Sequence, residues 1–133
     1  MDNNIVVDVT EYNNHLSQIE RINFAINHTD QAIFIAKGEH NEIPLFVFTN
    51  KKASDMLGYS SEELCDGMGS ISLDMEYSFE RMKLIEEEKH GQFETFYKTK
   101  SNKIIPVEVT VNFFLQNEEQ YKIIVVKDLS LLK

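Results

Sequence analysis

Cysteine and positive charge are both scarce in this chain of 133 residues. Cys65 is the single cysteine, so the chain can form neither an internal disulfide nor a cysteine-rich zinc site, which is typical of the reducing cytosol. Lysine and arginine number 13 against 22 aspartates and glutamates, giving a net charge of −9. Such a surface repels a phosphate backbone, and direct binding to nucleic acid is therefore disfavoured.

Long apolar runs are missing as well. No stretch approaches the roughly 20 apolar residues of a membrane-spanning helix, and residues 1–14 lack the basic segment that opens a signal peptide. We therefore expect a cytoplasmic protein without a membrane span. With 42% hydrophobic residues over this length, the chain can bury a single core.

The segment 48–64, FTNKKASDMLGYSSEEL, contains the most specific start and stop signals. Asn50 stands where a helix N-cap is expected, because its side-chain oxygen can accept from backbone NH groups one turn later. The residues that follow have the i, i+3, i+4 spacing of one apolar helix face: Ala53, Met56 and Leu57. Gly58 can adopt the positive φ that ends a helix, so a short helix is predicted between Asn50 and Gly58.

A second short helix is predicted directly after the first. Tyr59 lies just past the end of the first helix, and Ser60 or Ser61 can cap the next one. Glu63 stands three residues after Ser60, as in a capping box, and Leu64 falls on the buried side. Strand, helix, turn and helix therefore follow one another closely.

The pattern N-x-x-A-x-x-x-L-G-Y-S-x-E-E-L, formed by residues 50–64, resembles the central motif of PAS domains. These are the S-box type sensory modules of bacterial and archaeal signalling proteins. The resemblance extends from about Phe24 to Ser130 and includes AINHTDQAIFIA before the motif and KTKSNKIIPVEVTVNFF and IIVVKDLS after it. Each piece alone is a weak match, whereas the four in this order form a specific one.

Hydrophobic periodicity divides the rest of the chain into helices and strands. Helices are predicted for Thr10 to His28 and for Tyr77 to His90, the second ended by Gly91. Strands are predicted for residues 31–37, 43–49, 92–100, 103–115 and 121–126.

These elements predict an α+β domain with an antiparallel sheet of about five strands. The resemblance implies the PAS strand order 2-1-5-4-3, with short helices on one face of the sheet. We expect an N-terminal flanking amphipathic helix at residues 1–28, the PAS core at 29–128 and the start of a C-terminal linker at 129–133.

The predicted N-terminal helix carries an apolar stripe that includes Leu16 and Ile19. This stripe can cover the domain's own sheet, part of it can pair with a second subunit, and both can hold together. The last strand is apolar on both faces, and Ile124 and Val126 are assigned to an outer face that something covers. Leu16, Ile19, Ile124 and Val126 are therefore predicted to form a homodimer interface.

The resemblance also implies a pocket between the helices and the inner sheet face, which in PAS relatives holds haem, flavin, another chromophore, a small carboxylate or nothing. Cys65 comes too early for the cysteine of photoreactive flavin domains. His90 stands at the very end of the predicted helix on which haem-binding relatives carry their histidine. Both cofactors are therefore disfavoured, and the cofactor stays unknown.

No ring of cations suited to a carboxylate is evident in the inner-face pattern. Nine phenylalanines and five methionines indicate a pocket that is small, filled by its own side chains or suited to a small apolar ligand.

Catalysis is the alternative function for a small α+β fold. His40, Asp74 and His90 could be recruited as a histidine and carboxylate pair, but nothing in the sequence places them together. No G-x-S-x-G elbow, H-E-x-x-H helix, kinase motif or cyclase motif occurs. We therefore predict a domain without catalysis of its own.

The resemblance implies one surface ion pair. In flavin-binding relatives the second glutamate of the E-E-L segment pairs with a lysine near the end of the strand after the long helix. The matching residues here are Glu63 and Lys100.

The ending VVKDLS resembles the D-I-T type ending of PAS domains, from which the last strand leads into a helical linker. Asp128 and Ser130 can cap a helix that begins at Leu131, although these residues can also form a simple frayed tail. The function predicted is a sensor of signal transduction that couples pocket occupancy or dimer geometry to an effector. That effector can be a histidine kinase of a two-component phosphorelay, a diguanylate cyclase or a transcription regulator.

Overall fold

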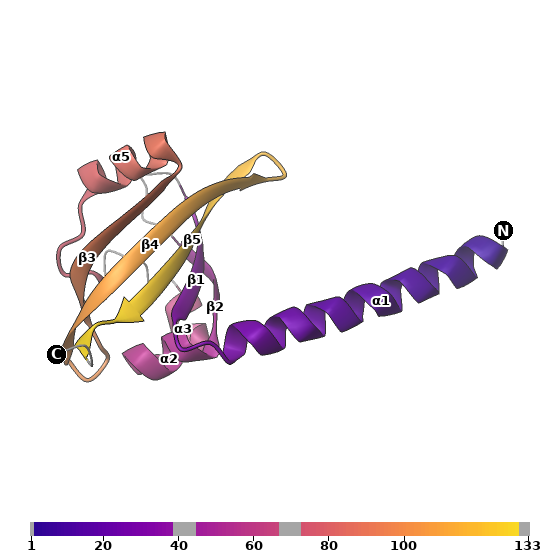
Figure 1. Ribbon diagram of the computed structural model, residues 1–133, viewed down its shortest axis with the longest axis horizontal. Coiled ribbons are helices and arrows are strands. Elements are labelled where there is room, and N and C mark those ends of the chain that lie inside the picture. The colour runs from indigo at the N-terminus through magenta and orange to yellow at the C-terminus, as the bar shows by residue number, and fades with distance from the viewer. Residues whose placement is uncertain (1, 39–44, 67–72, 131–133) are drawn as a thin grey trace.

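The computed structural model describes residues 2–38, 45–66 and 73–130. Its elements are α1 (Asp2–Asn27), β1 (Ala32–Lys37), β2 (Leu45–Thr49), α2 (Lys51–Leu57), α3 (Ser61–Cys65), α5 (Phe79–Glu88), β3 (His90–Lys98), β4 (Ile104–Gln116) and β5 (Glu119–Asp128). The strands form one antiparallel sheet in the order β2-β1-β5-β4-β3 (Figure 1). The predicted fold class and strand order are confirmed.

One face of this sheet forms the core. Alternate residues of β4 are buried, and because successive side chains of a strand point to opposite faces, this alternation directs one face inward. The helices α2, α3 and α5 each contribute side chains to the same core. The buried helix residues are Ala53, Leu57, Leu64, Met82 and Ile85.

Ile124 and Val126 belong to this core, so their assignment to the outer face is wrong. They are 1% and 0% exposed, and their partners across the sheet, Val111 and Val109, are buried core residues too. Because β5 is apolar on both faces, the sequence alone could not decide which parity points inward. The side chains on the outer face, from residues such as Val125, are partly exposed.

The helix α5 ends earlier than the sequence predicted. Lys89 adopts a φ of 69° and caps the helix, and His90 is already the first residue of β3. A lysine in the left-handed region is uncommon, so the sequence favours Gly91 as the residue that ends the helix. Gly91 has another role: a Cβ atom there would lie 2.5 Å from Cγ1 of Ile85, so the missing side chain lets α5 pack against β3.

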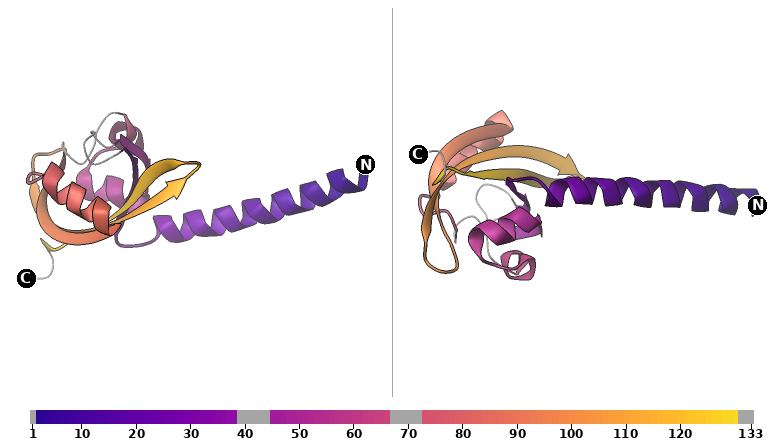
Figure 2. Two further views of the ribbon diagram at one scale, coloured as in Figure 1. Left: turned by 90° about the horizontal axis from the view of Figure 1, so that it is seen from above. Right: turned by 60° about the horizontal axis from the view of Figure 1, so that its bottom comes forward.

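The helix α1 projects away from the sheet instead of covering it (Figures 1 and 2). It begins at Asp2, well before the predicted start at Thr10. Its large apolar side chains between residues 9 and 24 are 38% to 66% exposed: Val9, Tyr12, Leu16, Ile19, Ile22 and Phe24. The expectation that the stripe covers the domain's own sheet is therefore wrong.

Asn50 joins α1, β1 and α2 at one point. Its Oδ1 accepts from the NH of Ala53 at 3.0 Å, which confirms the predicted N-cap, and from the NH of Ile33 at 2.9 Å. Its Nδ2 donates to the carbonyls of Ile26 at 2.8 Å and Gln31 at 3.1 Å. Asn50 is 1% exposed, so one buried amide makes four hydrogen bonds to three elements and the segments that join them.

Replacing Asn50 with alanine should lower the free energy of unfolding by about 3–5 kcal/mol, because several buried backbone groups lose their partners at once. Urea denaturation of the wild type and the variant measures this loss. Asn50→Asp keeps the acceptor oxygen at the N-cap but places a buried carboxylate against the carbonyls of Ile26 and Gln31, so its loss near pH 7 should be at least as large. An alanine variant within about 1 kcal/mol of the wild type would contradict this role for Asn50.

Candidate functional site

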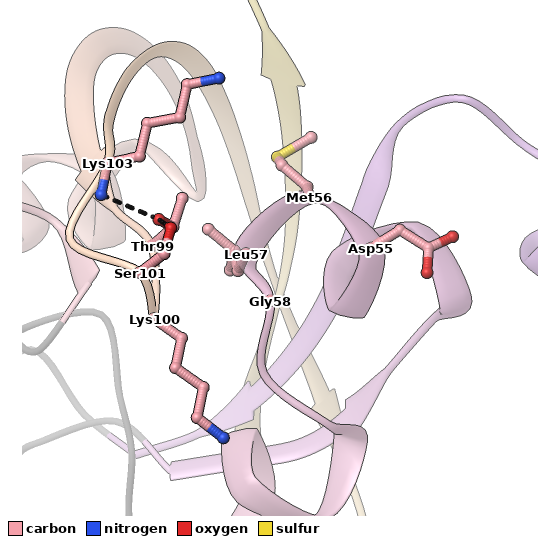
Figure 3. A pocket seen from close by; sticks show the side chains of 8 residues that line it. All are labelled: Asp55, Met56, Leu57, Gly58, Thr99, Lys100, Ser101 and Lys103. Carbon is pink, nitrogen blue, oxygen red and sulfur yellow. Dashed lines mark hydrogen bonds between the residues drawn. The ribbon is translucent and has the colours of Figure 1, made fainter.

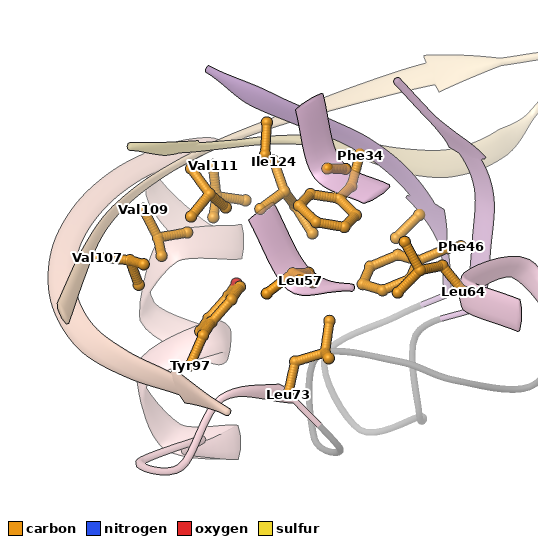
Figure 4. Packing of buried hydrophobic residues seen from close by; sticks show 14 of the residues in the cluster. Phe34, Phe46, Leu57, Leu64, Leu73, Tyr97, Val107, Val109, Val111 and Ile124 are labelled. Atoms are coloured by element: carbon orange, nitrogen blue, oxygen red, sulfur yellow. The ribbon is translucent and has the colours of Figure 1, made fainter. Parts of the chain in front are cut away.

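The protein's own side chains fill the space between the inner sheet face and the helices. In Figure 4, Phe34 and Phe46 lie beside each other, with ring centroids 4.8 Å apart, and Leu57 and Tyr97 extend toward the same centre. Each of these residues is at most 3% exposed. Among the described residues, the middle of the domain is thus packed rather than hollow.

Lys122 breaks the apolar pattern of the inner face. It is 0% exposed and shares the inward parity of Ile124, and its Nζ has no hydrogen-bond partner among the described residues. The Nζ lies 5.6 Å from the centre of the Phe113 ring. Burial lowers the pKa of Lys122 to about 8, while the nearby charge of Glu86 acts in the opposite direction.

Lys122 is not among the site residues predicted from the sequence. The last strand has apolar residues on both faces, and its inward parity was predicted wrongly. The available signal was the alternation itself, because the parity that buries Ile124 also buries Lys122.

Asp74 is part of a buried polar network beside α5. Its Oδ2 accepts from Nη2 of Arg81 at 2.7 Å, and its Oδ1 accepts from the Thr95 hydroxyl and from the NH of Glu76. The Arg81 guanidinium also lies 3.7 Å from the centroid of the Phe93 ring. Asp74 therefore connects α5 to β3 as a structural brace.

The residues considered for catalysis are not brought together. Asp74 forms a β-bridge with Tyr97, which lies seven residues beyond His90 along β3. At about 3.3 Å per residue, the two positions are roughly 23 Å apart along the strand. His40 lies outside the described residues. Asp74 and His90 thus form no catalytic pair.

The two residues considered for cofactor binding, Cys65 and His90, lie at the ends of elements. Cys65 is the last residue of α3, and burial raises the pKa of its thiol, which keeps it in the unreactive protonated form. His90 lies exposed at the start of β3 and not on α5. In the part of the chain that the structure describes, no cluster of three His, Cys, Asp or Glu side chains could hold a metal ion.

The predicted ion pair between Glu63 and Lys100 is present, with Nζ and Oε2 2.8 Å apart. Hydrogen bonding to Lys100 lowers the pKa of Glu63, and the NH of Ser60 adds to this effect. The same carboxylate completes the predicted capping box with Ser60. Lys100 Nζ also lies 5.9 Å from the centroid of the Tyr59 ring, so the pair connects the start of α3 to the turn after β3.

An open groove of about 350 Å³ lies beside this pair, between the end of α2 and the turn from Thr99 to Lys103 (Figure 3). Gly58 has a φ of 77°, as predicted for the end of α2, and the NH of Lys100 donates to the carbonyl of Leu57 at 2.9 Å. In Figure 3, Lys100 and Lys103 extend in opposite directions. Their charges therefore do not converge on the groove. The groove is the surface where the end of α2 packs against the turn.

Asp128 fixes the end of β5. Its Oδ1 accepts from the NH of Ser130 at 2.8 Å, and the intervening NH of Leu129 donates to the carbonyl of Pro106 at 2.9 Å. The chain is therefore held to β4 as it leaves the sheet. The helix predicted to begin at Leu131 lies outside the described residues.

The family model described as the PAS domain matches residues 30–130. The chain belongs to the PAS domain family. Members of this family are sensory modules of signalling proteins, and the sequence resemblance is thereby confirmed. No helix in the described part of this PAS domain is long and apolar enough to cross a membrane. A search of curated proteins returned no match.

Solved structures share the fold of this PAS domain. A PAS domain from a two-component sensor histidine kinase is 21% identical, with a TM-score of 0.76 over 86% of this chain and 98% of its own. The PAS domain of an HTR-like protein from Haloarcula marismortui is 15% identical, with a TM-score of 0.75 over 90% of this chain and 98% of its own. A blue-light activated histidine kinase from Erythrobacter litoralis is 14% identical, with a TM-score of 0.64 over 80% of this chain and 35% of its own.

Replacing Lys122 with methionine should stabilise the PAS domain near neutral pH. The pKa of about 8 lies below the 10.5 of an ordinary lysine, so the folded state binds this proton less tightly than the unfolded chain does. The lysine therefore costs stability below about pH 8, and this cost disappears as the pH rises to about 10.5. We expect a gain of about 1–3 kcal/mol near pH 7 that shrinks toward pH 10.

Urea denaturation of the Lys122→Met variant near pH 7 and near pH 10 measures this gain. Lys127→Met is the matched control, because Lys127 lies on the same strand with its side chain exposed. The control should follow the pH dependence of the wild type. A Lys122→Met variant that is less stable than the wild type near pH 7 would show that the amine stabilises the fold.

Proposed function

We propose that this PAS domain is a dimeric sensory and interaction module of the cytoplasm, without catalysis of its own, that passes a change in α1 or in the core to an effector. The observation that carries this proposal is the Asn50 amide, which bonds to the end of α1 and to β1. A displacement of α1 therefore acts directly on β1.

The register of the sheet supplies the next step. Ile33, which donates to Asn50, lies opposite Val125 of β5, and Ala32 lies opposite Val126. The entry into β1 and the exit from β5 are thus neighbours at one end of the sheet. A shift of β1 against β5 would therefore move Val126. Asp128, where the chain leaves the sheet, lies only two residues beyond Val126.

A histidine kinase is the effector that the comparisons favour over a diguanylate cyclase or a transcription regulator. The similar structures include a PAS domain from a sensor histidine kinase and a blue-light activated histidine kinase. We infer on this basis that the domain serves a two-component phosphorelay.

The exposed residues of α1 support pairing with a second copy of the chain. Val9, Tyr12, Leu16 and Ile19 are separated by three, four and three positions, which is the a and d spacing of a coiled coil. Asn23 takes the next a position, where a polar residue fixes the register of a parallel pair. A parallel coiled coil through α1 therefore forms the dimer in this proposal.

Replacing Leu16 and Ile19 together with glutamate should dissociate this dimer. Four carboxylates in the apolar seam of the pair should raise the dissociation constant by on the order of a hundredfold or more. Light scattering at high micromolar concentration measures the oligomeric state.

The matched control is Asn14→Glu, which adds a charge to the same helix at an f position, away from the seam. This variant should stay dimeric. A monomeric wild type, or a double variant with unchanged oligomeric state, would contradict dimerisation through α1.

Replacing Asp128 with alanine should uncouple the domain from its effector while leaving the domain folded. The Ser130 NH loses its acceptor, so its hydrogen exchange should speed up by on the order of fivefold. In a protein that joins this domain to a histidine kinase, kinase activity should then no longer follow the stimulus. Ser130→Ala is the control, because it keeps the backbone NH that Asp128 binds. A folded Asp128→Ala variant with an unchanged kinase response would reject this role.

A further inference from the structure

We propose that Lys122 is the anion-binding group of a small ligand site under the β4–β5 hairpin, and that the ligand is a small carboxylic acid with an apolar body. The site would give the sensory function proposed above its chemical stimulus, and in that respect it rests on that function. The binding itself rests only on the surroundings of Lys122.

The hairpin places Lys122 beside a hollow. Across β4 and β5, Phe113 lies opposite Lys122 and Leu115 lies opposite Gln120, so these four side chains share the inner face. The tip of the hairpin projects beyond the rest of the sheet (Figure 1). Beneath it is a cavity of about 220 Å³ lined by Lys89, Phe113, Phe114, Leu115 and Gln120.

The Nζ of Lys122 lacks the partner that a buried ammonium group requires. An ammonium group has three donors, and this one makes no hydrogen bond among the described residues. The Phe113 ring attracts it from one side only, at 5.6 Å. Glu86 influences it through its charge, but the Glu86 carboxylate already accepts from the Gln120 amide at 2.7 Å. An incoming anion would supply the missing acceptor.

The lining of the cavity selects the class of anion. Phe113, Phe114 and Leu115 give it an apolar wall, and Leu115 is 73% exposed, which places the wall at an open edge. The volume is below the roughly 300–1,000 Å³ of pockets for drug-sized ligands, so the ligand is small. One buried ammonium group balances one negative charge, which fits a carboxylate better than a doubly charged phosphate.

The ring of Phe113 separates the two parts of this site. It lines the cavity and also lies over the Nζ of Lys122. Lys122 itself does not line the cavity, so the site that we propose requires this ring to rotate until the cavity and the ammonium group meet. Ligand binding would then shift the part of β5 that contains Lys122 and Ile124. The same strand ends at Asp128.

Separate titrations of the full chain with sodium benzoate, acetate, hexanoate and inorganic phosphate test the proposal, with benzamide as the neutral match to benzoate. Changes in the ¹H–¹⁵N spectrum give the dissociation constants. We expect benzoate or hexanoate to bind and benzamide not to bind. Lys122→Met should weaken binding by at least about tenfold, because a charge-assisted hydrogen bond is lost. Lys127→Met, on the exposed side of β5, should bind like the wild type.

The pH dependence gives a second test that needs no variant. Glu86 and Lys89 are the other charged groups beside the site. Because the pKa of Lys122 is about 8, affinity should fall about tenfold between pH 7 and pH 9 as the amine loses its proton.

Equal binding by wild type and Lys122→Met, binding of inorganic phosphate in place of the carboxylates, or no binding by any of the three acids would each overturn the proposal. None of these outcomes bears on dimerisation through α1, which the Leu16 and Ile19 variants test separately. Failure of this site therefore leaves the proposed function standing, and failure of the dimer leaves this site standing.

Discussion

The arrangement of this domain depends on a single buried side-chain amide. Asn50 combines two acceptor bonds and two donor bonds at 1% exposure, and no other uncharged side chain of its size offers two N–H donors beside an oxygen that accepts two bonds. Aspartate lacks the donors, and serine is too short to reach both sides. The direction in which α1 leaves the domain, the start of β1 and the first turn of α2 are therefore all defined relative to one residue.

Local signals were the part of the fold that the sequence could predict. The N-cap at Asn50, the left-handed Gly58 and the capping box of Ser60 and Glu63 each depend on a few neighbouring residues. The Glu63 and Lys100 pair was predicted only through the family resemblance, since 37 residues separate the two along the chain. The features that were predicted wrongly, the parity of β5 and the end of α5, depend on tertiary context. The parity of β5 could not be read from a strand with two apolar faces, and Lys89 ends α5 in a conformation that sequence statistics assign to glycine.

Two buried charged groups illustrate different uses of polarity in this core. Asp74 is surrounded by donors from Arg81, Thr95 and the backbone, so its burial contributes to the connection between α5 and β3. Lys122 has no such set, and the Phe113 ring face and the charge of Glu86 offset its desolvation cost only in part. This difference could not be predicted from the sequence, because Asp74 and Lys122 are both single charged residues between apolar neighbours.

The pairing of Ala32 with Val126 also determines how the domain would respond to mechanical tension. The start of β1 and the end of β5 lie at the same end of an antiparallel pair, so force applied through α1 and through the exit would pull the two strands apart from that end. The hydrogen bonds between them lie perpendicular to the strands and would break one pair after another, as in unzipping, and not all together as in shear. Such a geometry yields at low force. Strain between neighbouring segments of a signalling protein would thus be expressed first at Asn50 and Asp128, before the core is disturbed.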